Sequence, residues 1–114
     1  VLPETVRVLE QTFYGCKNLR SVILPSKLEY IGIDTLRECT SLQSVVIPSD
    51  VTAIGDGALW ECSNLTNIVL HDKIENVSDT AFQYCENLDN ITVMKNGEAH
   101  VFSEIEEAVA FLAK

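Results

Sequence analysis

The chain has 114 residues and is 46% hydrophobic, which is enough to form one folded domain with a core. Seventeen acidic against eight basic side chains give a formal net charge of −9, which repels phosphate backbones and anionic lipid and argues against nucleic acid as a partner. No apolar run approaches the roughly 20 residues that cross a bilayer, and the N-terminus lacks a signal-peptide pattern, so we expect no membrane insertion.

The chain opens on Val1-Leu2-Pro3, which reads as the end of a strand that belongs to a preceding repeat. A repeat protein must cover the apolar faces at its two ends, because an uncovered end associates with other chains. We therefore expect either a longer array or a separate cap before this segment. Where neither is present, the uncapped first coil is free to self-associate end to end.

Four cysteines recur at intervals of 23 residues, and a leucine follows each of them three positions later. A fixed period of this size indicates a small unit that stacks on itself. Four further columns of apolar residues keep the same period: Val8, Ile31, Ile54 and Val77; Phe13, Leu36, Leu59 and Phe82; Val22, Val45, Ile68 and Ile91; Leu24, Ile47, Leu70 and Val93. We place about four repeats in residues 1–95 and treat residues 1–114 as a single domain.

Each unit combines two kinds of spacing. The last two columns lie two residues apart, as in a strand with one buried face, whereas the phenylalanine or leucine column lies three residues before the cysteine, as in one helical or 3₁₀ turn. Stacked units therefore predict a parallel sheet on one side and short helical turns on the other. The first unit is one residue short, and we place the missing residue in its turn at Leu2-Pro3-Glu4-Thr5.

The C-terminal residues 96–114 follow another pattern and predict a cap over the last coil. Asn96-Gly97 is typical of a type I′ hairpin turn, so the last strand should fold back on itself. Ser103 and Glu106 have the spacing of a capping box at the start of a helix. An apolar stripe predicts that this helix covers residues 104–113: Ile105, Ala108, Val109 and Leu112.

The stretch IGDGALWECSNLTNIVL at residues 54–70 resembles the BspA-type leucine-rich repeat, whose units read I-G-x-x-A-F-x-x-C-x-x-L-x-x-I-x-I-P. The resemblance covers about residues 1 to 95. It implies a leucine-rich repeat solenoid that is right-handed, with the parallel sheet on the concave face, short helical or 3₁₀ turns opposite, and the hairpin and helix as a cap.

The same resemblance implies a non-enzymatic protein-interaction module without a cofactor. Members of this family are typically found on the surface of bacteria or mucosal parasites, where they bind host matrix proteins or other cells, so we expect a secreted or cell-surface protein with a protein partner. Two alternatives stay open. The array is a structural spacer with no ligand of its own, or it is an intracellular scaffold, which four unpaired cysteines favour slightly.

The cysteines suggest chemistry that their spacing does not support. A zinc ion needs four ligands at about 2.3 Å, whereas four residues one coil apart spread over roughly 15 Å. Stacked equivalent residues also keep their Cβ atoms about 5 Å apart, beyond the usual disulfide span of about 3.5–4.5 Å. We therefore predict a column of buried free thiols that fill space as small apolar groups: Cys16, Cys39, Cys62 and Cys85.

Nucleophilic catalysis needs a base beside the thiol, and only His71 and His100 are available. His71 falls in the turn after a strand, across the coil from the cysteine column, and His100 belongs to the capping hairpin. We expect no catalytic residue, no metal site and no enzyme.

Alternate residues of each predicted strand face outward and form two parallel rows on the concave face. The rows are the candidate site for a protein partner: Ser21, Ser44, Asn67 and Asn90 beside Ile23, Val46, Val69 and Thr92. An apolar strip edged by amides and hydroxyls suits an extended segment of another protein. The alternative is that β-branched residues only stabilise neighbouring strands by cross-strand packing.

Trp60 is the conspicuous residue of the predicted turns, where it should face outward after the phenylalanine or leucine column. Tryptophan is enriched at interface hot spots, so Trp60 is a candidate contact on the outer face. A single ring half-covered by its neighbours is the simpler reading.

Overall fold

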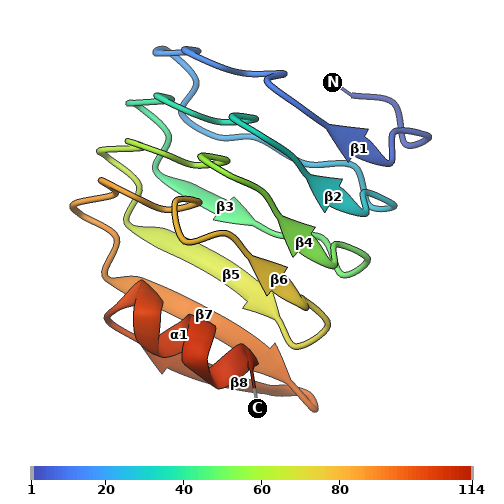
Figure 1. Cartoon of the computed structure of the whole chain (residues 1–114), viewed down its shortest axis with the longest axis vertical. Helices are drawn as coiled ribbons and strands as arrows, with labels where there is room; N and C mark the ends of the chain where they lie inside the picture. The colour runs from blue at the N-terminus through green and yellow to red at the C-terminus, as the bar shows by residue number, and fades with distance from the viewer. Residues whose placement is uncertain (1, 114) are drawn as a thin grey trace.

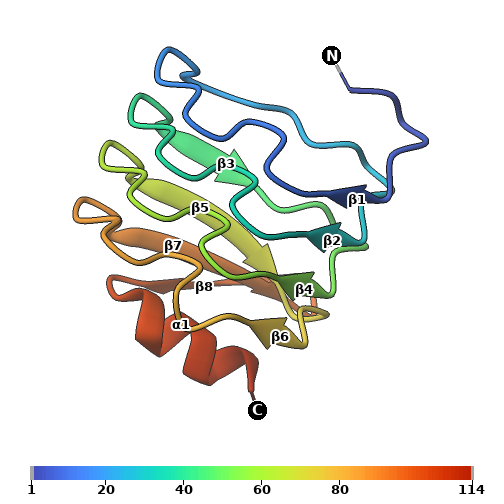
Figure 2. The ribbon, with the colours of Figure 1, turned by 45° about the horizontal axis from the view of Figure 1, so that its top comes forward.

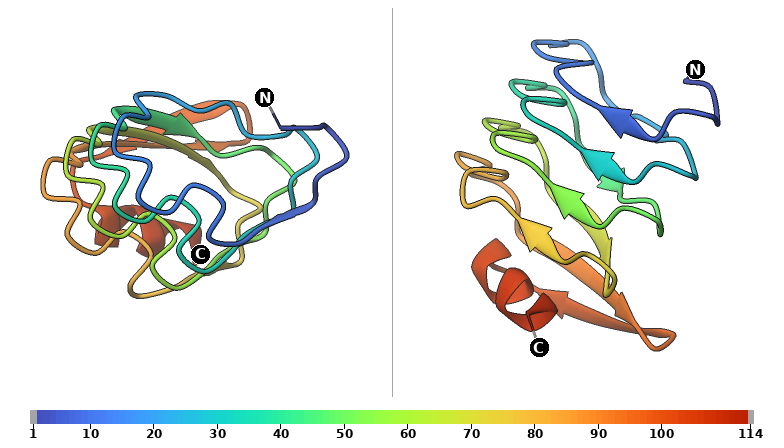
Figure 3. Two further views of the ribbon diagram at one scale, coloured as in Figure 1. Left: turned by 90° about the horizontal axis from the view of Figure 1, so that it is seen from above. Right: turned by 45° about the vertical axis from the view of Figure 1, so that its right-hand side comes forward.

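In the computed structural model, which describes residues 2–113, the chain winds through about four coils that stack in sequence order (Figure 1). The second, third and fourth coils each contribute a strand to one wall, all four coils contribute a two-residue strand to the other, and a hairpin and helix follow the last coil (Figure 3). The solenoid predicted from the 23-residue period is confirmed. Val1, which we assigned to a preceding strand, and the final Lys114 lie outside the described residues.

The long sheet forms one wall, in the order β3-β5-β7-β8 (Figure 2). Its parallel strands are β3 (Ser44–Val46), β5 (Asn67–His71) and β7 (Asn90–Lys95), and they pair at intervals of 23 residues. Inward residues of the predicted columns are buried along these strands because each coil covers the apolar edge of the next. The first coil adds no strand here, although the Gln43 N–H donates to the Arg20 carbonyl at 3.1 Å.

The short sheet forms the other wall, in the order β1-β2-β4-β6. Its strands are two residues long: β1 (Val8–Leu9), β2 (Tyr30–Ile31), β4 (Ala53–Ile54) and β6 (Asn76–Val77). The sequence pattern did not reveal this sheet, because alternation over two residues carries no signal.

The register of the first coil differs from the prediction. Leu9, not Val8, pairs with Ile31, and Leu9 is 4% exposed whereas Val8 is 51% exposed. The turn at Pro3 has its full length, because the Val6 N–H donates to the Pro3 carbonyl as Leu28 does to Pro25. The missing residue therefore lies between Leu9 and Phe13, and our placement of it in the Leu2-Pro3-Glu4-Thr5 turn was wrong.

The third side of each coil consists of single turns closed by i to i+3 hydrogen bonds, such as Cys16 N–H to the Phe13 carbonyl at 3.0 Å. The only helix among residues 2–113 is α1 (Ile105–Leu112). Neighbouring turns are joined by further backbone bonds, such as Leu36 N–H to the Ala58 carbonyl at 2.7 Å. These bonds tie the coils together where no sheet is present.

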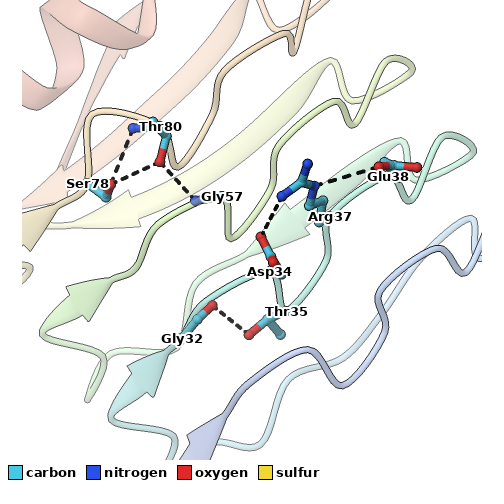
Figure 4. Close-up of polar contacts among 8 residues, drawn as sticks. All are labelled: Gly32, Asp34, Thr35, Arg37, Glu38, Gly57, Ser78 and Thr80. Carbon is cyan, nitrogen blue, oxygen red and sulfur yellow. Dashed lines mark hydrogen bonds and ion pairs between the residues drawn. The ribbon is translucent and has the colours of Figure 1, made fainter.

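Polar side chains reinforce the contacts between coils (Figure 4). The fully buried Thr35 hydroxyl donates to the Gly32 carbonyl at 2.8 Å, and it also lies 3.1 Å from the Leu9 carbonyl of the coil before. The Gly57 N–H donates to the Thr80 hydroxyl of the next coil at 3.1 Å. Buried polar groups on these turns thus find partners one coil away.

The hairpin and helix follow the prediction closely. Asn96 and Gly97 both have positive φ values, 54° and 78°, as a type I′ turn requires, and they join β7 to the antiparallel β8 (Glu98–Phe102). Helix α1 buries Ala108 fully, and its Phe111 ring lies 5.3 Å from that of Phe102. The cap thereby covers the inner side of the hairpin.

The capping box predicted for Ser103 and Glu106 is wrong. The helix N-cap is Glu104, which makes no side-chain cap hydrogen bond. Because the helix begins one residue later than predicted, the residue three positions after the N-cap is Glu107 rather than Glu106. Both glutamates still stabilise the first turn through the helix dipole.

Candidate protein-binding site

The predicted outward residues of the long sheet do lie together on its solvent-facing side. β3 places Val46 directly beside Val69 of β5, and Val69 lies beside Thr92 of β7. Partners in adjacent parallel strands point to the same face of a sheet. Ile23, one period before Val46 in the first coil, is 92% exposed.

The row is longer than the sequence indicated. Thr92 pairs with Val101 of the antiparallel strand β8, and Val101 is 65% exposed. Directly opposed residues of an antiparallel pair share a face, so Val101 continues the line. The signal was present in the sequence, because a two-residue Asn96-Gly97 turn fixes this register. We call the full set the apolar row: Ile23, Val46, Val69, Thr92 and Val101.

A second line of side chains runs beside the apolar row and is polar. Its four members are exposed: Ser21, Ser44, Asn67 and Asn90. Asn67 Nδ2 donates to the Thr66 hydroxyl at 3.2 Å, and that hydroxyl donates to the Gln43 carbonyl at 3.3 Å. Between the first two coils the surface holds a hollow of about 420 Å³, to which Ser21, Ile23, Ser44 and Val46 contribute.

Charge is absent from both lines in a chain whose formal net charge is −9. Val46 is 63% exposed, and Val69 and Thr92 are half-buried by their neighbours. The face therefore offers apolar contact edged by hydrogen-bonding groups rather than a field that selects one sign of charge.

The cysteines form a column inside the turns, and all four are free. Three thiols each donate to a carbonyl of the coil before: Cys39 to Phe13, Cys62 to Leu36 and Cys85 to Leu59, at 3.0–3.1 Å. We expected four buried thiols, but only Cys39 and Cys62 are fully buried. Cys16 has no described coil on its outer side, and Cys85 borders a cleft beside α1.

The thiol environments predict different reactivities. Burial raises the pKa of Cys39 to about 11, and the neighbouring Cys85 thiol together with burial raises the pKa of Cys62. Only the thiolate attacks a disulfide reagent. We therefore expect that, at about pH 8 in the native protein, a thiol reagent leaves Cys39 and Cys62 unmodified. The partly exposed Cys16 and Cys85 should react under the same conditions. Mass spectrometry of the labelled peptides locates the sites. Labelling of Cys39 or Cys62 without unfolding, or fewer than four reactive thiols in denatured, unreduced protein, would contradict this arrangement.

His71 and His100 do not provide a base for these thiols. The Lys73 N–H donates to His71 Nδ1 at 3.1 Å, so Nε2 carries the proton and donates to the Pro48 carbonyl at 2.8 Å. Burial lowers the pKa of His71, which keeps the ring neutral. The centroid of the His100 ring lies 4.8 Å from that of Phe111 of α1, with the two ring planes tilted by 37°. Both imidazoles have structural partners, and residues 2–113 contain no cluster of His, Cys, Asp and Glu suited to a metal ion.

Trp60 lies on the turn side and is half-buried by residues of its own chain. The Arg37 guanidinium carbon lies 4.1 Å from the centroid of the Trp60 ring, and the Tyr84 ring meets Trp60 edge-on at 5.1 Å. Arg37 is in turn held by Asp34 at 3.3 Å and by Glu38 at 3.6 Å (Figure 4). The ring therefore joins a stack that links neighbouring coils. Its role as an outer contact stays a prediction.

Several inward side chains of the first coil are only partly buried, although Leu9 and Leu24 of the same coil are buried. This set comprises Leu2, Val6, Phe13, Leu19 and Val22. They have no further coil against them within residues 2–113. End-to-end association through this face stays a prediction.

Comparison with known proteins agrees with this architecture. The sequence profile of the BspA type leucine rich repeat region matches residues 1–107 in six copies. The chain belongs to the BspA-type leucine-rich repeat family. Repeat proteins of this kind are interaction or scaffold modules. A search of the curated proteins finds no match to this BspA-type chain.

A solved structure shares the fold of this BspA-type chain. It is the crystal structure of a leucine rich cell surface protein from Faecalibacterium prausnitzii A2-165, with a TM-score of 0.66 and 22% sequence identity. The alignment covers 82% of this chain and 26% of the other, so the chain spans about a quarter of that protein. In residues 2–113, no helix has both the length and the apolar character needed to cross a membrane.

Proposed function

We propose that the apolar row binds an extended segment of another protein, with the polar line beside it contributing hydrogen bonds. The observation that carries the proposal is the exposure of Ile23, Val46 and Val101 at 92%, 63% and 65% along one continuous face. Cross-strand packing alone explains β-branched residues on a sheet, but it does not require apolar side chains to remain this exposed. An extended segment laid across the strands can contact all the coils at once.

The partner in this proposal is a protein outside the cell, such as a host matrix protein, and the chain acts in surface adhesion. This part rests on the family and on the cell-surface relative from F. prausnitzii. The proposed role in adhesion is that of a whole surface protein, of which repeats such as these form a part. The rival function is that of a spacer, in which the apolar row has no ligand.

The double variant Val46→Lys/Val69→Lys tests the proposal. Both side chains reach solvent, so lysine can extend into water without unfolding the sheet. The two added charges should weaken the apolar contact between the row and its partner. We expect binding to a panel of purified extracellular matrix proteins, measured by surface plasmon resonance, to weaken about tenfold or more for the protein that binds the wild type.

The matched control is Val8→Lys/Ile33→Lys, which makes the same chemical change at residues that are 51% and 45% exposed but lie off the long sheet. The control should bind like the wild type. Equal loss in both variants would show a general charge effect and contradict the proposal. Absence of any binding partner in the panel would favour the spacer.

A further inference from the structure

A cleft of about 710 Å³ separates the turn side of the fourth coil from helix α1, away from the apolar row. Figure 2 shows α1 running beside the segment that follows β6. The residues that line the cleft come from two segments, 77–88 of the fourth coil and 104–110 of the cap. The volume falls in the range of pockets that hold a ligand or a few residues of a peptide.

The inner surface of the cleft is apolar. Phe82 and Leu88 are buried at its base, and Ile105 and Val109 of α1 are half-buried on the facing wall. In the interior of a solenoid a following coil would cover such residues, but α1 stands off from them and leaves the gap. The cleft thus presents apolar surface from two elements to one occupant.

The rim carries one sign of charge. Four exposed carboxylates border the cleft: Asp79, Glu86, Glu104 and Glu106. No lysine, arginine or histidine is among the lining residues. The dipole of α1 favours Glu104 and Glu106, but it gives no reason for Asp79 and Glu86, which belong to the coil.

We propose that this cleft docks a short extended peptide segment in which lysine or arginine alternates with bulky apolar side chains. The apolar residues would contact the Phe82 side of the cleft while the cations meet the rim. The negative formal charge of −9 adds attraction at longer range, and a peptide bearing both features complements the base and the rim together. This site and its occupant are independent of the apolar row, which carries no charge.

The test uses an acetylated, amidated and fluorescently labelled peptide of alternating leucine and lysine, with binding followed by fluorescence polarisation. Neutralising the rim in the variant Asp79→Asn/Glu86→Gln/Glu104→Gln/Glu106→Gln should raise the dissociation constant about tenfold or more. The matched control removes four exposed carboxylates that do not line the cleft, in the variant Glu29→Gln/Asp50→Asn/Asp72→Asn/Glu107→Gln. The control changes the net charge equally and should bind nearly as tightly as the wild type.

A second peptide with serine in place of leucine should bind about tenfold more weakly, because it cannot use the apolar base. Circular dichroism of each variant establishes that it is folded. The proposal is overturned if the two variants lose affinity equally, if the serine peptide binds as well as the leucine peptide, or if the wild type shows no binding at about 1 mM peptide.

Discussion

Replacing Leu59 by alanine is expected to lower the free energy of unfolding by about 2–5 kcal/mol. Leu59 lies in the third coil and is fully buried, and its N–H donates to the Ala81 carbonyl of the next coil at 2.7 Å. The substitution leaves a cavity in the third coil. Backbone hydrogen bonds hold this coil to the coils before and after it, so the surrounding residues cannot readily move in to fill the cavity. Because the stability of a repeat array includes the interfaces between neighbouring coils, weakening the contacts of the third coil should lower the stability of the stack. Equilibrium denaturation by urea measures it.

The matched control is Ile23→Ala, the same kind of truncation at a side chain that is 92% exposed. It should change the free energy of unfolding by less than about 0.5 kcal/mol, because little buried contact is lost. The same variant should weaken partner binding if the apolar row is the binding face. A large stability loss for Ile23→Ala would mean that this residue packs against the sheet and would remove it from the proposed site.

The variant Gly32→Ala is expected to destabilise the protein by about 1–3 kcal/mol. A Cβ atom at this position would lie 2.6 Å from the Leu9 carbonyl oxygen of the coil before, and also 2.6 Å from Glu10 Cγ. The carbonyl cannot move freely, because it accepts the Gly32 N–H at 2.7 Å. The methyl group should therefore push the first two coils apart.

The double variant Glu10→Ala/Gly32→Ala separates the two close contacts. Glu10 is exposed and flexible, so its loss should not restore stability if the Leu9 backbone is the obstacle. Full recovery in the double variant would assign the effect to the Glu10 side chain instead. Thermal unfolding, followed by circular dichroism, compares the stability of Gly32→Ala with that of the double variant.

The stacking and the inward faces could be predicted from the sequence because they depend on a simple period. Once Cys39 and Cys62 are aligned, the register that pairs Val46 with Val69 follows directly. The hairpin could be predicted for a similar reason, since only residues that tolerate positive φ fit a type I′ turn. The same register brought the exposed residues of the candidate site onto one face.

Other features depend on choices that a period does not decide. Val8 and Leu9 are both apolar, so alignment on Phe13 favoured Val8, while the structure keeps Leu9 inward and omits a residue after it. The capping box failed because several polar residues precede α1, and only the backbone decides which becomes the N-cap. The cleft beside α1 depends on how the helix packs against the fourth coil, and the spacing of residues along the sequence does not describe that packing.

The most direct test of the apolar row as a protein-binding face is a methyl NMR spectrum of protein labelled at isoleucine and valine, recorded with and without the matrix protein that binds it. We expect the methyl signals of Ile23, Val46 and Val69 to shift or broaden, while those of Val8 and Ile33, which lie off the long sheet, stay unchanged. The opposite pattern, with Val8 and Ile33 perturbed and the apolar row unaffected, would contradict the proposed site.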